Sequence, residues 1–211
     1  MEDPAVFALD RVRFEVLRHF GYFVTESSTH MAEYVPYFLK DSAEIERLQI
    51  RTRTGESFAS QRASREEAVM KALREEAGEI PEIRRSNEYA ARIIHAIETD
   101  TPATIVGNVP NTGLMTNLLN GACVEVPCLV DGAGLQPCYI GDLPPQCAGL
   151  CQSNVAMQHL AVRALVEGNR EHVYHAAMLD PNTASQLTLP AIRKTIDRLL
   201  DAQRELMPTL A

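Results

Sequence analysis

The sequence predicts an α+β fold in which a small, mostly antiparallel sheet packs against a larger set of helices. Two observations predict this class. Apolar residues recur at helical spacing before residue 99 and again after residue 145. Between these regions, residues 103–140 hold three short runs rich in valine and leucine, separated by glycine, proline and asparagine. Helices, then closely spaced strands, then helices are typical of an α+β domain.

The first predicted helix ends at Gly21, because glycine is a common residue just after a helix. A second helix is predicted over residues 30–40, with Ser27 or Ser28 as its N-cap. Pro36 is expected to kink or divide this helix, because proline cannot donate a backbone hydrogen bond.

A third helix is predicted over residues 42–50 and leads into a polar stretch, residues 51–64, that we expect to be a mobile loop. A capping box at Ser64 opens a helix that runs to about residue 77. One more helix is predicted over residues 86–98.

The remaining elements follow from a change in pattern. Strands are predicted at residues 103–109, 124–130 and 135–140. Helices are predicted at residues 146–167, 170–178 and 190–206, the last opening on a proline that suits a first helical position.

The acidic balance of the chain limits its partners. The 211 residues carry a formal net charge of −8. Nucleic acids and anionic membranes attract clustered lysine and arginine. The one basic run, residues 47–62, is interrupted by Glu56 and suits a solvated face better than a phosphate site. We therefore expect neither a nucleic-acid partner nor a membrane partner.

Cysteine usage and the N-terminus predict a cytoplasmic protein. The acidic start, Met-Glu-Asp-Pro, does not resemble a signal peptide, and no stretch reaches the roughly 18 to 20 apolar residues of a membrane span. Five cysteines, an odd number, favour free thiols in a reducing compartment. Cys147 and Cys151 stand four residues apart on a predicted helix, where they are small buried thiols or, alternatively, two metal ligands.

Residues 26–34, ESSTHMAEY, form a chemically dense segment between aromatic residues. In a helix, His30 and Tyr34 stand at positions i and i+4, where they project from one face and could share a hydrogen bond. A tyrosinate can act as a general base if a nearby cation or metal lowers its pKa from about 10. The alternative is a helix cap with Tyr34 as a half-buried amphipathic residue.

Three asparagines, Asn108, Asn111 and Asn117, follow the first predicted strand. The asparagine amide can bind sugar hydroxyls, but it also stabilises tight turns, and the residues alone favour the turn for Asn111. The sequence contains no G-x-G-x-x-G or Walker loop for nucleotide phosphates, no G-x-S-x-G and no H-E-x-x-H.

Two segments together resemble the C-terminal half of glycoside hydrolase family 4, and most closely its α-galactosidase branch. They are FGYFVTESSTHMAEYVPYFLK and GNVPNTGLMTNLLNGACVEVPCLVDGAGLQPCYIGDLPPQCAGL, and the likeness continues through HLAVRALVEGNREHVYHAAMLDP. The resemblance implies that residues 1–211 form a C-terminal substrate and oligomerisation domain. Its fold would be that of the C-terminal domain of the lactate/malate-dehydrogenase-like family 4 glycosidases.

The resemblance implies hydrolysis of O-glycosidic bonds in α-galactosides or related α-hexosides. In this family a tightly held NAD oxidises the sugar at carbon 3, and a divalent metal, usually manganese, polarises the ketone. A base removes the carbon 2 proton, the aglycone leaves by elimination, water adds and the hydride returns. Tyr34 matches the position of the base. The residues implied to contact the substrate are Ser27, Ser28, His30, Glu33 and Asn111.

The resemblance also implies that the NAD loop and the metal ligands belong to an N-terminal dinucleotide-binding domain that this chain lacks. No cofactor-binding or metal-binding residue is therefore assigned here. The expected partners are a small carbohydrate and either further copies of the chain or a complementary N-terminal half. The alternative function is a catalytically inactive remnant that oligomerises or binds a partner.

Overall fold

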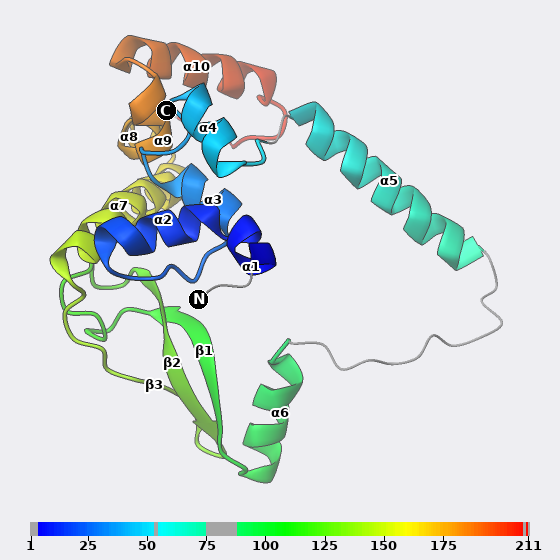
Figure 1. Ribbon diagram of the computed structural model, residues 1–211, viewed down its shortest axis with the longest axis vertical. Coiled ribbons are helices and arrows are strands. Elements are labelled where there is room, and N and C mark those ends of the chain that lie inside the picture. The colour runs from blue at the N-terminus through cyan, green and yellow to red at the C-terminus, as the bar shows by residue number, and fades with distance from the viewer. Residues whose placement is uncertain (1–3, 53–54, 75–87, 209, 211) are drawn as a thin grey trace.

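The computed structural model describes residues 4–52, 55–74, 88–208 and 210, and places most of the helices beyond one end of a small sheet (Figure 1). This is the predicted α+β class, with a three-stranded sheet that is antiparallel throughout. The helices are α1 (Pro4–Leu9), α2 (Arg11–Phe20), α3 (Ser28–Tyr34), α4 (Ser42–Leu48), α5 (Gly55–Arg74), α6 (Ala90–Thr99), α7 (Pro145–Glu167), α8 (Arg170–Leu179), α9 (Pro181–Gln186) and α10 (Leu189–Ala202). The strands are β1 (Ala103–Pro110), β2 (Cys123–Asp131) and β3 (Gly134–Pro137).

α2 ends where the sequence predicts a helix stop. Gly21 has a φ of 80°, in the left-handed region that glycine enters without steric cost, and its N–H bonds to the Leu17 carbonyl at 2.9 Å. The helix predicted over residues 42–50 is α4, which ends slightly earlier because Gln49 takes a φ of 52°. α1 is not predicted from the sequence pattern.

α3 is shorter than the helix predicted over residues 30–40. Ser27 is its N-cap, with Oγ accepting a backbone hydrogen bond from the first turn. The helix ends at Tyr34 because the residue before a proline is pushed out of the helical region, and Val35 is extended ahead of Pro36. The prediction is therefore wrong beyond Tyr34, and the proline divides the segment.

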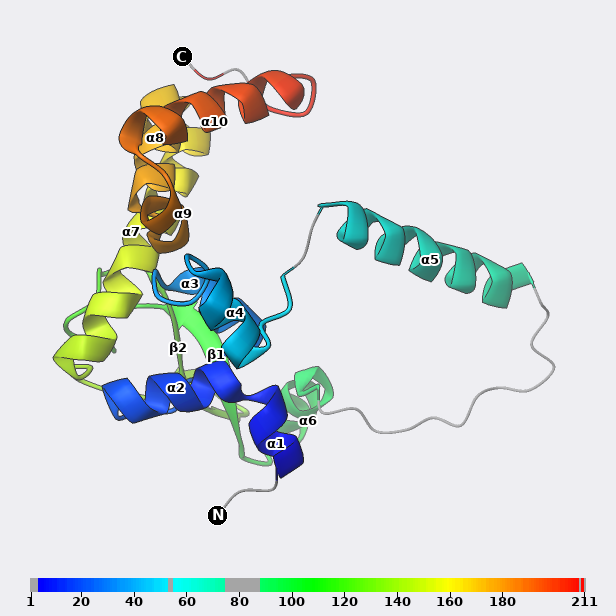
Figure 2. The same ribbon diagram turned by 45° about the horizontal axis from the view of Figure 1, so that its top comes forward.

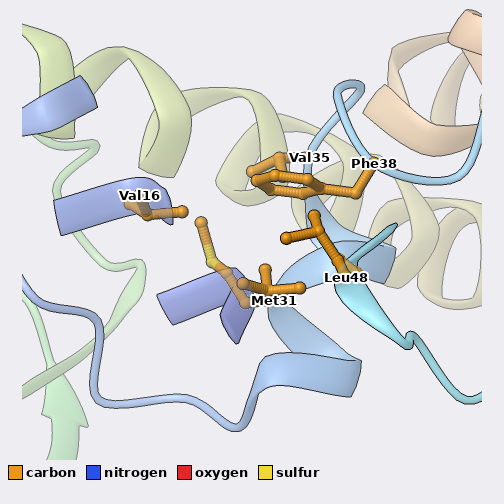
Figure 3. Packing of buried hydrophobic residues seen from close by; sticks show 7 residues of the cluster. Val16, Met31, Val35, Phe38 and Leu48 are labelled. Atoms are coloured by element: carbon orange, nitrogen blue, oxygen red, sulfur yellow. The ribbon is translucent and has the colours of Figure 1, made fainter. Parts of the chain in front are cut away.

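A first core holds α2, α3 and α4 together (Figure 3). Its labelled side chains, Val16, Met31, Val35, Phe38 and Leu48, point toward one another from separate elements and are each at most 6 % exposed. Each such side chain contributes about 1.5–3 kcal/mol by leaving water. This burial fixes the inner side of α3, and the polar residues of the helix are partly buried or exposed.

The sheet forms a second core with α6, which lies along it in Figure 1. β1 pairs with β2 from Ala103 opposite Val130 to Pro110 opposite Cys123, and β2 continues into the short β3. Alternate residues of β2 are buried, as expected for a strand with one covered face. The buried cluster is Ala96, Ile105, Leu114, Val124, Val126, Cys128 and Val130.

β3 ends at Pro137, earlier than the predicted end at residue 140. Proline has no N–H for the strand ladder, so the regular pairing stops there. The Cys138 N–H still donates to the Pro127 carbonyl of β2 at 2.8 Å, but the Ile140 N–H donates to the Leu114 carbonyl at 2.8 Å. This segment therefore bonds to the loop between β1 and β2 and does not lengthen the sheet.

α5 contradicts the loop predicted over residues 51–64. The helix begins at Gly55, so Ser64 lies inside it and is not an N-cap. The stretch contains no proline and is rich in alanine, glutamate and arginine, so helix propensity prevails over its polar character. The predicted helix end near residue 77 and the predicted start at residue 86 lie outside the described residues.

α5 also stands apart from the other helices in two views (Figures 1 and 2). Every side chain between residues 59 and 71 is exposed, including Val69 and Met70. None of these side chains joins either core.

The last helices form an arm that leads away from the sheet (Figure 2). α7 is close to its predicted range, and α8 packs against both α7 and α10. Tyr174 is 4 % exposed, and its hydroxyl donates to the Asp197 carboxylate, which also accepts a bond from Arg170 at 2.8 Å. α9 is not predicted, and α10 ends at Ala202, before the predicted residue 206. No helix within the described ranges is long and apolar enough to cross a membrane.

Candidate active site around α3

A small network fixes the start of α3. The Glu26 carboxylate accepts a bond from the Ser27 N–H at 2.7 Å and lies 3.2 Å from Nδ1 of His30. The Ser27 N–H and, to a smaller extent, the His30 ring lower the pKa of the Glu26 carboxyl. His30 thus pairs with Glu26. The rings of His30 and Tyr34 share a face with centroids 6.2 Å apart, but the described contacts include no hydrogen bond between them.

Tyr34 lies on the wall of a cavity of about 540 Å³ between α3, the start of α7 and the base of the sheet. The residue is 45 % exposed, so it belongs to the surface of the cavity and not to a core. On α7, Asn154 donates from Nδ2 to the Tyr34 carbonyl at 3.1 Å and thereby anchors the end of α3.

The cavity is mainly apolar. Its apolar and aromatic lining includes Phe20, Tyr22, Phe23, Val24, Met31, Met115, Leu118, Leu143, Leu150 and Val155. Its polar lining is Thr25, Tyr34, Glu125, Asn154 and Gln158. Aromatic faces beside a few hydrogen-bonding groups suit a ligand with both apolar and polar surfaces, as a glycoside has.

Three thiols also line this cavity, from Cys123, Cys147 and Cys151. Desolvation raises the pKa of the Cys147 thiol and of the Cys151 thiol, and the neighbouring Cys147 adds to the effect at Cys151. Both are free and stand one turn apart on α7. Within the described residues, no group of three His, Cys, Asp or Glu side chains is placed to hold a metal ion.

The other predicted site residues do not reach the Tyr34 cavity. Ser27 serves as the cap. Ser28 lines a separate pocket beside α2 and α4. Glu33 lines a third, next to α9. Successive residues of a helix project about 100° apart, so a segment this dense in polar residues distributes them around the helix. The structure therefore brings the predicted residues together on one element but not into one cavity.

Asn111 lies elsewhere, in the loop between β1 and β2. It is 1 % exposed. Its Nδ2 donates to the carbonyls of Met115, Leu118 and Leu119 at 2.9–3.2 Å, and its Oδ1 accepts from the Met115 N–H at 3.0 Å. The amide is fully used by the loop backbone and has no group left for a sugar. The geometry favours the turn-building role over substrate contact.

The cavity also has contributors that the sequence analysis does not single out, among them three residues. The aromatic residues Tyr22 and Phe23 flank the dense segment, and their position beside it is the signal that could have indicated them. Asn154 gives no such signal, because it stands alone in the middle of a long helix and reaches α3 only through the tertiary fold.

Residues 1–183 match the C-terminal domain of the family 4 glycosyl hydrolases. The chain belongs to this family. An α-galactosidase of Bacillus subtilis is 42 % identical over 94 % of this chain and 46 % of its own length. An α-galactosidase of Rhizobium meliloti is 33 % identical over 99 % of this chain and 44 % of its own length. The chain thus spans about half the length of these family 4 relatives.

Solved family 4 structures share the fold. A 6-phospho-α-glucosidase from gut microorganisms, crystallised with NAD and Mn²⁺, aligns with a TM-score of 0.72 at 18 % identity, over 100 % of this chain and 47 % of that one. At this identity the likeness concerns the fold alone. It confirms the predicted architecture of a family 4 C-terminal half.

Proposed function

We propose that residues 1–211 form the substrate and oligomerisation domain of an α-galactosidase-like enzyme that hydrolyses O-glycosidic bonds. The 42 % identity to the Bacillus subtilis α-galactosidase, over nearly the whole chain, is the observation that carries this proposal. A second α-galactosidase matches over a similar length. In this proposal the chain supplies the sugar-pocket half of the enzyme, and α-galactosides or related α-hexosides are the substrates.

Tyr34 is the proposed general base. Its half-exposed position on the wall of the 540 Å³ cavity supports the assignment, because a base must be within reach of the proton that it removes. The Asn154 bond to its carbonyl holds the end of α3 on α7, so the position of the ring is set by two elements. In this role the phenolic oxygen accepts the proton from carbon 2 of the sugar.

Ser27, Ser28, His30 and Glu33 are proposed to contact the sugar or to position its surroundings. Their common location on or beside α3 supports this, as does the 42 % identity of nearly the whole chain to the Bacillus subtilis α-galactosidase. Because they face different directions, contact with one sugar requires a second surface that closes over α3. Asn111 is left out of this set, since its amide is occupied.

NAD and Mn²⁺ are the proposed cofactors, and a protein of the same fold was crystallised with both. The described part of this chain does not fit either one: it offers no trio of metal-ligating side chains. The full sequence also has no glycine-rich phosphate loop. We expect both to bind mainly through the other half of a complete enzyme. The steps left to this chain are holding the sugar and accepting a proton.

The test is hydrolysis of 4-nitrophenyl α-galactoside in the presence of NAD, Mn²⁺ and a reductant. The chain is assayed alone, and again after mixing with a separately expressed N-terminal half of the Bacillus subtilis α-galactosidase. Activity of the mixture, with neither half active alone, is the expected result.

No activity in the mixture, with this chain folded by circular dichroism and shown to bind the added half, would contradict the proposal. It would favour the alternative of a non-catalytic domain that oligomerises or binds a partner. The exposed apolar side chains Val162, Leu165 and Val166 on α7, and Leu189 on α10, are the observation that supports that alternative.

A further inference from the structure

A second, smaller pocket lies on the other side of α3 from Tyr34, and its chemistry differs from that of the cavity. It has a volume of about 260 Å³ and is bordered by the end of α1, the start of α2, the first residues of α3 and the end of α4. A water molecule occupies about 30 Å³ of liquid, so the pocket has room for a small ion with several waters. Arg11, Ser28, Thr29, Gln49 and Arg51 supply its polar lining.

The pocket is positively charged although the chain as a whole is acidic. Arg11 and Arg51 both line it, and no aspartate or glutamate among the described side chains does. Among the described residues, neither guanidinium has a carboxylate within salt-bridge distance. The neighbouring Arg13 and Arg47, by contrast, are each paired. Arg11 makes one described hydrogen bond, from Nη1 to the Arg47 carbonyl at 3.3 Å. Two unpaired arginines in a chain of net charge −8 are an unusual concentration of free positive charge.

Two buried donors on residues that border this pocket lack partners. Nε of Arg11 and Oγ of Ser28 are both shielded from solvent, and neither has a hydrogen-bond partner within the described structure. Buried polar groups in native proteins are almost always paired, so these two donors favour a hydrogen-bond acceptor at this place, which they reach when their side chains turn toward the pocket. Guanidinium groups match the paired oxygens of phosphate and carboxylate.

We propose that Arg11, Ser28 and Arg51 form a binding site for a small oxyanion, a phosphate or a carboxylate. Each arginine offers N–H donors and a positive charge, and the serine hydroxyl donates a further bond. The proposal does not rest on glycosidase activity, because the site is defined by the residues of this chain alone.

The test is isothermal titration of the full chain with inorganic phosphate and, separately, with galacturonate as the carboxylate ligand. We expect saturable binding of at least one of them with a Kd in the range of about 0.1–5 mM, weakening as salt is raised. Saturation by phosphate alone identifies a phosphate group as the ligand, and saturation by galacturonate alone identifies a carboxylate. Galactose at the same concentrations is the neutral control.

Variants then locate the site. Arg51→Gln is expected to weaken binding by about tenfold or more, and Ser28→Ala by about threefold. Arg18→Gln is the matched control, because Arg18 is an exposed arginine of α2 outside the pocket, and it should bind as the parent chain does. Absence of saturable binding of either oxyanion, or equal binding by all three variants, would overturn the proposal. Arg51 lies outside both cores, so a folding defect cannot imitate the expected loss.

Discussion

At the scale of single residues, Tyr34 offers the most direct test of the proposed chemistry. Tyr34→Phe removes the phenolic oxygen and leaves the ring in the cavity. We expect turnover of a reconstituted enzyme to fall by roughly 10²–10⁴-fold, the usual contribution of a general base, with little change in KM or in melting temperature.

Tyr37→Phe is the control for this prediction, because Tyr37 is similarly exposed at 43 % but does not line the cavity. If Tyr34→Phe turns over at the parent rate, the residue has no part in proton transfer and the function of α3 is structural.

A second prediction at this scale concerns the contribution of Asn111 to the stability of the folded chain. Asn111→Ala leaves three carbonyls and one N–H of a buried loop without their partner. We expect the free energy of unfolding to fall by about 2–4 kcal/mol in urea titration. Asn108→Ala changes an exposed asparagine on β1 and should alter it by less than about 0.5 kcal/mol. Equal effects of the two substitutions would show that the loop tolerates the loss.

At the scale of elements, the contact between α8 and α10 should make stability depend on acidity. The Tyr174 hydroxyl and then Arg170 bond to the Asp197 carboxylate and hold its pKa below the ordinary value near 3.9. A lowered pKa in the folded state means that the unfolded chain binds the proton more readily. This contribution to stability is therefore complete above about pH 4 and is lost as the pH falls further.

The measurement is the melting temperature of the chain and of Asp197→Asn between pH 3 and pH 7. We expect the variant to melt lower at neutral pH and the difference to shrink as the pH falls through the titration of the carboxyl group. A difference that stays constant across this range would show that the charge of Asp197 does not stabilise the α8–α10 contact.

The elements also show which sequence signals are sufficient to predict local structure. Gly21 and the valine-rich strands follow local rules, so the end of α2 and the sheet were predicted closely. Pro36 is predicted to kink or divide the helix, but the prediction does not include its effect on Val35, which ends α3 at Tyr34. Residues 55–64 of α5 are predicted as a loop because they are mostly polar, and polarity alone does not separate a solvated helix from a loop. Residues 64–74 fall within the predicted helix.

The candidate site was less predictable than the fold for a geometric reason. A dense polar segment such as residues 26–34 indicates chemistry, but the pocket that each side chain reaches depends on which elements pack against the helix. Tyr34 and Ser28 border different pockets because α7 lies on one side of α3 and α4 on the other. The contact between Asn154 and Tyr34 joins residues 120 positions apart, and no local pattern encodes it.

At the scale of the whole molecule, the separation of α5 from both cores predicts that its backbone amides are less protected from hydrogen exchange than those of packed helices. A helix without tertiary packing is marginal in water, so its amides open often. In hydrogen exchange followed by mass spectrometry, we expect peptides from Gly55–Arg74 to exchange at least about tenfold faster than peptides from α7. Comparable protection would mean that α5 packs against another copy or another part of the protein in solution.

The exposed state of α5 also has a consequence for how this sequence can change over evolutionary time. Within the described residues, the side chains of residues 59–71 belong to neither core, so a substitution there is free of the constraint of core packing. Constant positions in α2 or α7 reflect both core packing and external contact. Constant positions on α5, compared across orthologous sequences, would reflect the helix itself, including its Arg62–Glu66 pair, and whatever it contacts outside the two cores.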